Sequence, residues 1–201
     1  MILFSQVPIG SLFMYDGRLY RRLSKNYKQA SESNQLTETD LMTPIMPVDN
    51  VPFVLPDNTI EYFDLRGKPH RANGPAIESP NGYQAWYWHG KLHRKDGPAL
   101  TEVCKTQIWY YRGKRHRVDG PAVIRYNGDT DWFYNGLYHR TNGPARDYRS
   151  TTGLEIWYNN GKLHRTDGPA IIRPDGSVEY WINDQAVTEY EFMFLSGANY
   201  D

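Results

Sequence analysis

The fold of this chain is decided by the stretch Trp157-Tyr158-Asn159-Asn160-Gly161-Lys162-Leu163-His164-Arg165-Thr166-Asp167-Gly168-Pro169-Ala170, because close copies of it recur along the sequence. The earlier copies contain Gly-x-x-His-Arg segments that begin at Gly67, Gly90, Gly113 and Gly136. The prolines of the five copies are Pro75, Pro98, Pro121, Pro144 and Pro169, so the period is 23 residues with one insertion of two. A fixed period of this kind is typical of stacked supersecondary units.

Each copy predicts two short β-strands. The residues before the first glycine are aromatic or β-branched, as in Ile108-Trp109-Tyr110-Tyr111, and such residues fit a pleated surface. Asn135-Gly136 and Asn160-Gly161 adopt left-handed conformations easily, which a tight hairpin turn requires. A short apolar run such as Ala122-Val123-Ile124 follows the Gly-Pro pair. We therefore predict an all-β fold, an elongated twisted antiparallel β-ribbon in which neighbouring hairpins stack.

The repeated phrase resembles a known family. An aromatic residue followed by Asn-Gly-Lys-x-His and small residues, at a period near 23, is similar to the MORN repeat (membrane occupation and recognition nexus), particularly its divergent prokaryotic and phage variety. The resemblance covers about residues 59–187 and implies five and a half β-hairpin repeats within residues 57–187. MORN repeats usually have glycine directly after the histidine, whereas this chain has Arg71, Arg94, Arg117, Arg140 and Arg165.

Residues 1–56 lack the repeat and predict a small SH3-like β module. Leu12-Phe13-Met14-Tyr15 and Arg18-Leu19-Tyr20-Arg21-Arg22-Leu23 flank Asp16-Gly17, which is a strong hairpin signal. The opening Val7-Pro8-Ile9-Gly10, with Phe-x-x-x-Gly-x-x-Tyr after it, is similar to short uncharacterised modules of tailed-phage proteins. This resemblance implies a phage-encoded protein. We also expect any homo-oligomer to form through this module.

Residues 188–201 predict a capping helix and a tail. Thr188 and Glu191 have the spacing of a capping box ahead of Phe192-Met193-Phe194-Leu195, so a short helix is expected there. The sixth copy stops just before it, with Gln185 in the place of the glycine. We expect the helix to cover the open edge of the last strand, which would otherwise pair with another chain.

Charge and composition exclude several classes of function. The 23 Lys and Arg residues balance 23 Asp and Glu residues, so no net field attracts nucleic acid or a membrane surface. Cys104 is the only cysteine, which excludes an internal disulfide and a cysteine-rich metal site. The sequence has no signal-peptide pattern and no run of about 18 apolar residues. These features predict a cytoplasmic protein, in the host cytoplasm if the chain is phage-encoded.

Five histidines occupy equivalent places in the repeats, and metal binding does not account for them. Equivalent atoms two strands apart are separated by about 9 to 10 Å, whereas zinc ligands lie about 2.0 to 2.1 Å from the ion. In a structural interpretation, each His and Arg hydrogen-bonds the Asp or Asn two positions on, or the neighbouring repeat, and fixes the Gly-Pro turn. The alternative is ligand binding. The residues concerned are His70, His93, His116, His139, His164, Asp96, Asp119 and Asp167.

The pattern favours a non-enzymatic interaction protein without cofactor or metal. Arg, Tyr and Trp dominate interface hot spots, and the candidate partner-binding residues are Arg94, Arg117, Arg140, Arg165, Trp88, Tyr111 and Tyr134. The leading hypothesis is that this face binds and inhibits a host protein of a defence or housekeeping complex. An alternative is capture of an anionic small ligand such as a signalling nucleotide. A third is peripheral membrane or phosphoinositide attachment, suggested by the family name, against which the zero net charge argues.

Overall fold

The computed structural model describes residues 12–15, 18–21, 52–64 and 66–196. The chain divides into two units. The first comprises Met1–Pro80 and Trp86–Lys91, and the second comprises Asn81–Ala85 and Leu92–Asp201. Both are built from antiparallel β-strands, and one short helix lies near the C-terminus. The described part of the chain is therefore nearly all β, as the repeats predict.

The first unit contains the predicted N-terminal hairpin. Strands β1 (Leu12–Tyr15) and β2 (Arg18–Arg21) pair antiparallel, which confirms that prediction. The Asp16-Gly17 turn and most of the predicted SH3-like module lie outside the described residues. Strands β3 (Phe53–Val54), β4 (Ile60–Glu61) and β5 (Ile77–Glu78) pair antiparallel in that order. Strand β3, from the end of the predicted module, thus pairs with the first strand of the repeat region.

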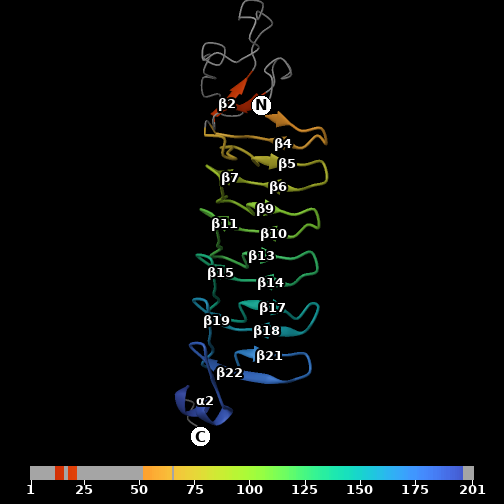
Figure 1. The fold of residues 1–201 in the computed structure, drawn as a ribbon. Helices are drawn as coiled ribbons and strands as arrows, with labels where there is room; N and C mark the ends of the chain where they lie inside the picture. Colours follow the sequence, from red (N-terminus) through yellow and green to blue (C-terminus); the bar gives the residue numbers. More distant parts are fainter. Residues whose placement is uncertain (1–11, 16–17, 22–51, 65, 197–201) are drawn as a thin grey trace, which may run out of the picture. The chain divides into compact units, whose positions relative to one another are not determined.

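The second unit is a ladder of short antiparallel strands that stack as successive rungs (Figure 1). In spatial order the strands are β6 (Gln84–Ala85), β9 (Leu100–Thr101), β10 (Gln107–Ile108), β13 (Val123–Ile124), β14 (Thr130–Asp131), β17 (Arg146–Tyr148), β18 (Leu154–Ile156), β21 (Ile171–Ile172), β22 (Val178–Ile182) and β23 (Gln185–Val187). Each neighbour in this order is hydrogen-bonded to the next. The predicted ribbon of stacked hairpins is therefore confirmed for this unit.

A second row of hairpins runs along the ladder (Figure 1). In the second unit it consists of β11 (Tyr110–Tyr111) with β12 (Lys114–Arg115), β15 (Phe133–Tyr134) with β16 (Leu137–Tyr138), and β19 (Tyr158–Asn159) with β20 (Lys162–Leu163). Strand β7 (Tyr87–Trp88) of the first unit pairs with β8 (Lys91–Leu92) in a hairpin of the same kind. A complete repeat therefore has four very short strands in two rows: two in the predicted ribbon and two more that the sequence analysis did not separate from it.

The division into two rows occurs at the tryptophan of the repeat, through its backbone hydrogen bonds. The Trp109 N–H donates to the Ala122 carbonyl at 2.8 Å, and its own carbonyl accepts from the His116 N–H at 3.1 Å. The chain therefore leaves the ladder at Trp109 and continues as a separate hairpin. The hairpin turns have the predicted left-handed geometry, with φ of 51° at Asn135 and 88° at Gly136.

The core of the second unit is thin and is built largely from rings and alanines. Buried Ile108, Val123 and Phe133 pack with an alanine, and partly buried Trp109 and Tyr138 cover them. The alanine that follows each Gly-Pro pair has no exposed surface; these residues are Ala99, Ala122, Ala145 and Ala170. Since each of these alanines lies between packed rungs, a larger side chain at the position would have to displace its neighbours.

The predicted capping helix is present as α2 (Glu189–Leu195). Thr188 and Glu191 form both hydrogen bonds of the capping box, which confirms the predicted helix start. Phe192 is the buried residue of the helix, and its ring centroid lies 4.8 Å from that of Tyr180 on β22. One detail of the sequence prediction was wrong. Asp184, with φ of 67° and its N–H bonded to the Leu163 carbonyl, takes the place of the turn glycine that the sequence analysis gave to Gln185.

Candidate interaction site

Four of the repeat arginines, Arg71, Arg117, Arg140 and Arg165, pack the guanidinium group on an aromatic ring of their own repeat. The Cζ atom of Arg117 lies 4.2 Å from the centre of the Trp109 ring, a distance at which the ring quadrupole attracts a cation. The equivalent pairs are Arg71 on Tyr62 at 3.9 Å, Arg140 on Trp132 at 4.1 Å and Arg165 on Trp157 at 4.0 Å. The arginine that follows the repeat histidine is thus a packing residue in these four repeats.

The other face of the guanidinium group is covered by the glycine three positions on. A Cβ atom added to Gly120 would lie 2.8 Å from the Arg117 Cζ atom, closer than Cβ contacts come in real proteins. Arg117 also donates from Nη1 to the Pro121 carbonyl at 3.3 Å. Trp109, Arg117 and Gly120 therefore form a three-layer sandwich that holds the Gly-Pro turn in place.

The aspartates two positions after the arginines make exposed ion pairs. Arg117 Nε donates to Asp119 Oδ1 at 3.1 Å, and Arg165 Nε donates to Asp167 Oδ1 at 2.7 Å. The hydrogen bond from Arg117 lowers the pKa of the Asp119 carboxyl. Both aspartate side chains are more than four-fifths exposed, so solvent screens these pairs and they stabilise the fold little. Asp96 lines a groove beside Arg94.

The repeat histidines join each hairpin of the second row to the next. The Nδ1 atom of His116 accepts a hydrogen bond at 3.0 Å from the backbone N–H of Asn135, the first turn residue of hairpin β15–β16. The equivalent pairs are His70 with His89 (3.2 Å), His93 with Arg112 (3.3 Å), His139 with Asn160 (3.2 Å) and His164 with Asn183 (3.2 Å). Only an unprotonated Nδ1 atom can accept, so the ring proton belongs on Nε2. The histidines thus hold the hairpin turn of the following repeat, and the arginines hold the Gly-Pro turn.

Two of the predicted partner-binding aromatics lie between these histidines on the outside of the hairpin row. We call this set the ring strip; its members are His93, Tyr111, His116, Tyr134 and His139. Successive ring centroids along it are 4.9, 5.9, 4.9 and 6.0 Å apart. The two tyrosines are 38% and 46% exposed. The strip ends where Asn159 takes the place of a third tyrosine. The structure therefore assembles histidines and tyrosines on one surface, whereas Arg117, Arg140 and Arg165 are packed on the tryptophan rings.

Trp88, the third predicted aromatic, belongs to the first unit. Its side chain is 49% exposed, and its ring centroid lies 4.6 Å from that of His70 and 5.2 Å from that of His89. His89 Nδ1 lies 2.8 Å from Asp64 Oδ2. Burial of Asp64 alone would raise its pKa, but the hydrogen bonds from His89 and from the backbone lower it overall. The exposed Trp88 ring thus packs against His70 and His89, and His89 is itself bonded to Asp64.

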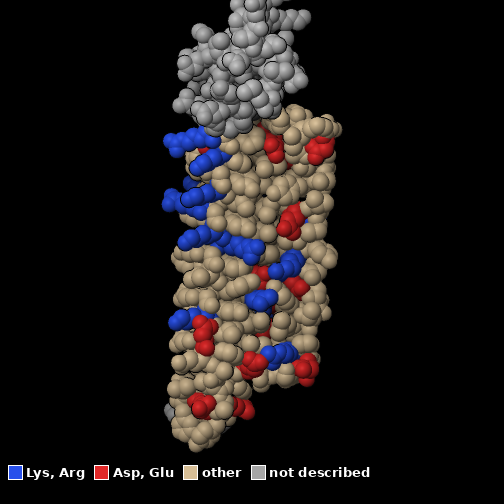
Figure 2. Space-filling view, in the orientation of Figure 1, with Lys and Arg blue, Asp and Glu red and all other residues tan. Residues whose placement is uncertain are grey.

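Charge is distributed unevenly along the hairpin row. The turn of β11–β12 carries Arg112, Lys114 and Arg115, whereas the equivalent turn of β15–β16 carries Asn135 and Leu137. Figure 2 shows Lys and Arg side chains gathered on this side at the level of β11 and absent from it at the level of β15. This positive charge affects the pKa of the neighbouring His93. Burial, and then the charges of Lys95 and Arg112, lower the pKa of His93.

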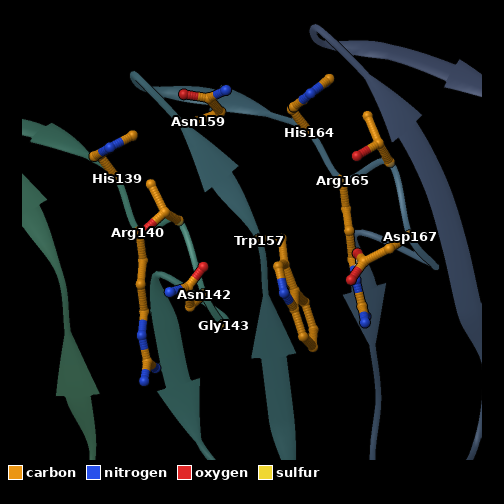
Figure 3. Close-up of a pocket in the computed structure, with 11 residues that line it drawn as sticks. His139, Arg140, Asn142, Gly143, Trp157, Asn159, His164, Arg165 and Asp167 are labelled. Carbon is orange, nitrogen blue, oxygen red and sulfur yellow. Dashed lines mark hydrogen bonds and ion pairs between the residues drawn. The ribbon is translucent and has the colours of Figure 1, made fainter. Parts of the chain in front are cut away.

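Open grooves separate the Gly-Pro loops of successive repeats. One groove of about 660 Å³ has Trp157 between Arg140 and Arg165, with Asn159 and Asp167 at its rim (Figure 3). An equivalent groove of about 580 Å³ lies two repeats earlier and is lined by Arg94, Trp109, Tyr111, Arg117 and Asp119 among others. The Arg140, Arg165 and Arg117 side chains each donate to a proline carbonyl of their own loop, so one donor of each is already used within the fold.

A buried polar cluster inside the ladder was missed by the sequence analysis. Asp131 is fully buried, and its Oδ2 atom accepts from Arg125 Nη2 at 2.6 Å while its Oδ1 atom accepts from the Tyr148 hydroxyl at 3.0 Å. Arg146 Nε lies 3.8 Å from the same carboxylate. Burial, followed by the charge of Asp131, raises the pKa of Tyr138 beside it.

The signal for this cluster is visible when the repeats are placed in the observed register. Asp131 occupies the strand position that is Ile108 and Ile156 in the flanking repeats, directly before the tryptophan. Its cross-strand neighbour Arg146 occupies the position of Val123. An aspartate opposite an arginine at two otherwise apolar positions indicates a buried ion pair, and comparison of the repeats could have found it.

Among the described residues, no cluster of three or more His, Cys, Asp or Glu side chains could hold a metal ion. No helix in the part of the chain that the structure describes is long and apolar enough to cross a membrane. No family model matches the sequence, and no curated protein matches it.

Proposed function

We propose that this chain is a non-enzymatic protein-interaction module that binds its partner through the ring strip. The observation that carries the proposal is the exposure of Tyr111 and Tyr134 between histidines that are themselves held by hydrogen bonds. Tyrosine has few rotatable bonds and presents a large amphipathic ring, so it binds at low cost in conformational entropy. A row of such rings on a rigid repeat scaffold suits a protein surface.

The ring strip is a better interaction surface than the arginine row. The side chains of Arg117, Arg140 and Arg165 are 20 to 24% exposed, and each is packed on a tryptophan and bonded to a proline carbonyl. A partner that used these guanidinium groups would have to compete with the fold. The arginines therefore support the surface from behind, and the tyrosines make the contact.

The partner that we propose is a host protein, and the consequence of binding is its inhibition. This part of the proposal depends on the resemblance of the N-terminal segment to tailed-phage modules, and it places the complex in the host cytoplasm. We do not propose catalysis, since a row of near-identical repeats provides no unique nucleophile and base pair among the described residues.

Affinity capture with matched tyrosine variants tests this proposal. The tagged full chain, the Tyr111→Ala/Tyr134→Ala variant and the Tyr126→Ala variant are used to capture proteins from a lysate of the native host. Tyr126 is 73% exposed and lies in the β13–β14 turn, away from the hairpin row, so it controls for loss of any exposed tyrosine. We expect one protein to be retained by the chain and by Tyr126→Ala and to be lost with the double variant. A partner retained equally by all three would refute the role of the ring strip.

A second candidate function is capture of an anionic small ligand in the grooves between loops. The repeated Arg-Trp-Arg arrangement of Figure 3 favours it, because a planar anion could stack near Trp157 and accept hydrogen bonds at the rim. A thermal-shift panel of nucleotides is the test, since a ligand raises the melting temperature by mass action. A shift that Trp157→Leu abolishes would support capture in this groove, and no shift with any nucleotide would exclude the tested compounds.

A further inference from the structure

We propose that the hairpin row binds an acidic protein segment, and that the segment is anchored at the β11–β12 end of the ring strip. This inference rests on the proposed function and names the chemistry of the partner. The recognition set is Tyr111 together with three cations, Lys95, Arg112 and Lys114, which we call the basic end.

The basic end combines a ring with positive charges held in fixed positions. The Cζ atom of Arg112 lies 5.3 Å from the centre of the Tyr111 ring, so charge and ring present one surface. Arg112 has a positive φ of 51°, and its N–H is bonded to His93 Nδ1, which fixes the turn that carries the cations. Arg112 and Lys114 are exposed. A preorganised set of this kind loses little entropy on binding.

The nearby acidic groups do not neutralise this set. Asp119 pairs with Arg117 on the adjacent loop, and Asp96 lies in the same groove. Within residues 52–64 and 66–196, none of the observed ion pairs involves Lys95, Arg112 or Lys114. The positive charge therefore remains available for a partner, although the chain as a whole has zero net charge.

The charge falls along the row, which gives the site a direction. Lys162 is the lone cation of the β19–β20 turn, and Asp184 makes the last turn acidic. A negatively charged segment is thus attracted to one end of the strip and repelled from the other. A partner whose carboxylates stand next to apolar side chains would meet the cations and the tyrosines at the same time.

A protein segment fits this site better than a nucleic acid does. Nucleic-acid affinity grows with the number of phosphates neutralised along a continuous basic track. The β15–β16 turn interrupts such a track with Asn135 and Leu137, and Leu137 is 51% exposed. An exposed leucine beside Tyr134 offers an apolar contact that a peptide side chain can use and that a phosphate backbone cannot.

A charge reversal with a matched control tests this inference on the full chain. Lys114→Glu and Lys162→Glu change the same exposed position, directly after the turn glycine, in two hairpins. Lys162 lies two repeats away, about 19 Å along the row, which exceeds the screening length of about 10 Å. The probe is a fluorescently labelled copolymer of Glu and Tyr, and the measurement is fluorescence anisotropy. A Lys and Tyr copolymer is the probe control.

We expect the Glu and Tyr copolymer to bind the unmodified chain, Lys114→Glu to weaken binding about fivefold or more, and Lys162→Glu to change it by less than about twofold. Tyr111→Ala should weaken it as well, and Asn159→Ala, at the equivalent place, should not. No binding, or equal weakening by both lysine variants, would overturn the inference. So would displacement of the copolymer by a single-stranded oligonucleotide at equal charge concentration, because the site would then be a polyanion site.

The outcomes for this inference and for the proposed function can be told apart. If the captured host protein depends on Tyr111 and Tyr134 but is retained by Lys114→Glu, the ring strip stands as the interface and the acidic partner is wrong. If the copolymer depends on Lys114 but no host protein depends on the two tyrosines, the basic end binds acidic chains and the proposed function is wrong. Equal melting temperatures of the two lysine variants show that folding does not account for either result.

Discussion

Arg117 lies between Trp109 and Gly120. This packing explains why the repeat has a tryptophan, an arginine and a glycine at positions that are several residues apart in the sequence. The glycine is needed because a Cβ atom would meet the guanidinium group, and the arginine is needed because it bonds the proline carbonyl of the same turn. The histidine just before the arginine acts on the next repeat. One dipeptide therefore stabilises its own turn and its neighbour's turn at once.

The sandwich predicts strong coupling between Arg117 and Gly120. Gly120→Ala should lower the free energy of unfolding by about 1–3 kcal/mol, because the methyl group must push the guanidinium group off Trp109. In the Arg117→Ala background the same change should cost much less, since the obstructing group is gone. Urea unfolding of the four proteins of this double-mutant cycle measures the coupling. Additive effects would show that the glycine and the arginine act separately.

The lowered pKa of His93 predicts a dependence of stability on pH. The fold favours the neutral ring, so as the pH falls through the usual value of 6.5 the unfolded chain takes up a proton before the folded chain does. The contribution of His93 is therefore complete above that pH and is lost below it. His93→Asn keeps an acceptor for the Arg112 N–H but does not titrate. We expect its free energy of unfolding to fall less than that of the unmodified chain between about pH 8 and about pH 5.

At the scale of the strand, the ladder contains one polar rung where the others are apolar. Asp131 and Arg146 face each other on β14 and β17, while the matching pair on β10 and β13 is Ile108 and Val123. A buried ion pair costs desolvation free energy and rarely stabilises a fold more than apolar side chains of similar volume would. The pair does, however, penalise any shift in register, because a shift would bury both charges without partners.

The Asp131 cluster predicts opposite results for a single and a double substitution. Asp131→Asn leaves Arg125 and Arg146 without their buried counter-ion and should lower the free energy of unfolding by about 3 kcal/mol. Asp131→Ile with Arg146→Val copies the apolar pair of the neighbouring rung and should restore part of this loss, since Arg125 alone still lacks its counter-ion. Thermal unfolding followed by circular dichroism measures both. A double variant no more stable than the single one would show that the polar cluster is required for packing of this rung.

The elements were predictable from the sequence to different degrees, for physical reasons. The turns and the helix start were predicted because their signals are local. The Asn135-Gly136 turn and the capping box of Thr188 and Glu191 each depend on residues that are only a few positions apart in the sequence. The break of the strand at Trp109 depends on a hydrogen bond to Ala122, thirteen positions away, and no local propensity encodes it. The bond of Arg117 to Asp119 was part of the structural interpretation of the sequence, but its packing on Trp109 was missed, since this ring lies eight residues upstream.

At the scale of the second unit, each repeat contacts mainly its neighbours, so stability should behave as a chain of nearest-neighbour terms. The period of the sequence was sufficient to predict this arrangement. It was not sufficient to predict which surface is exposed, because both the arginines and the tyrosines recur with the same spacing. Only the packing of the guanidinium groups on the tryptophan rings separates packing residues from contact residues.

Nearest-neighbour stability predicts that damage to the capping helix stays local. Phe192→Ala should release α2 and increase amide hydrogen exchange in β22 and β23, while exchange in β9 and β10 remains unchanged. Phe194→Ala is the control, because Phe194 is 73% exposed on the same helix. Hydrogen exchange followed by mass spectrometry resolves these segments. A uniform increase along the whole ladder would show that the unit unfolds as a single cooperative block.

The hydrogen bonds of the repeat histidines all run in one direction along the chain, since each Nδ1 atom accepts from a turn N–H of the repeat that follows. The last such bond runs from the Asn183 N–H to His164 Nδ1. In the next repeat the position of the histidine, three residues after the turn residue Asp184, is occupied by Val187. A valine side chain has no hydrogen-bond acceptor. If a hairpin of a second molecule packed against this end, the backbone N–H of its first turn residue would therefore have no side-chain acceptor. Open-ended polymerisation through this end is thereby discouraged by a single aliphatic residue, independently of the helix that follows.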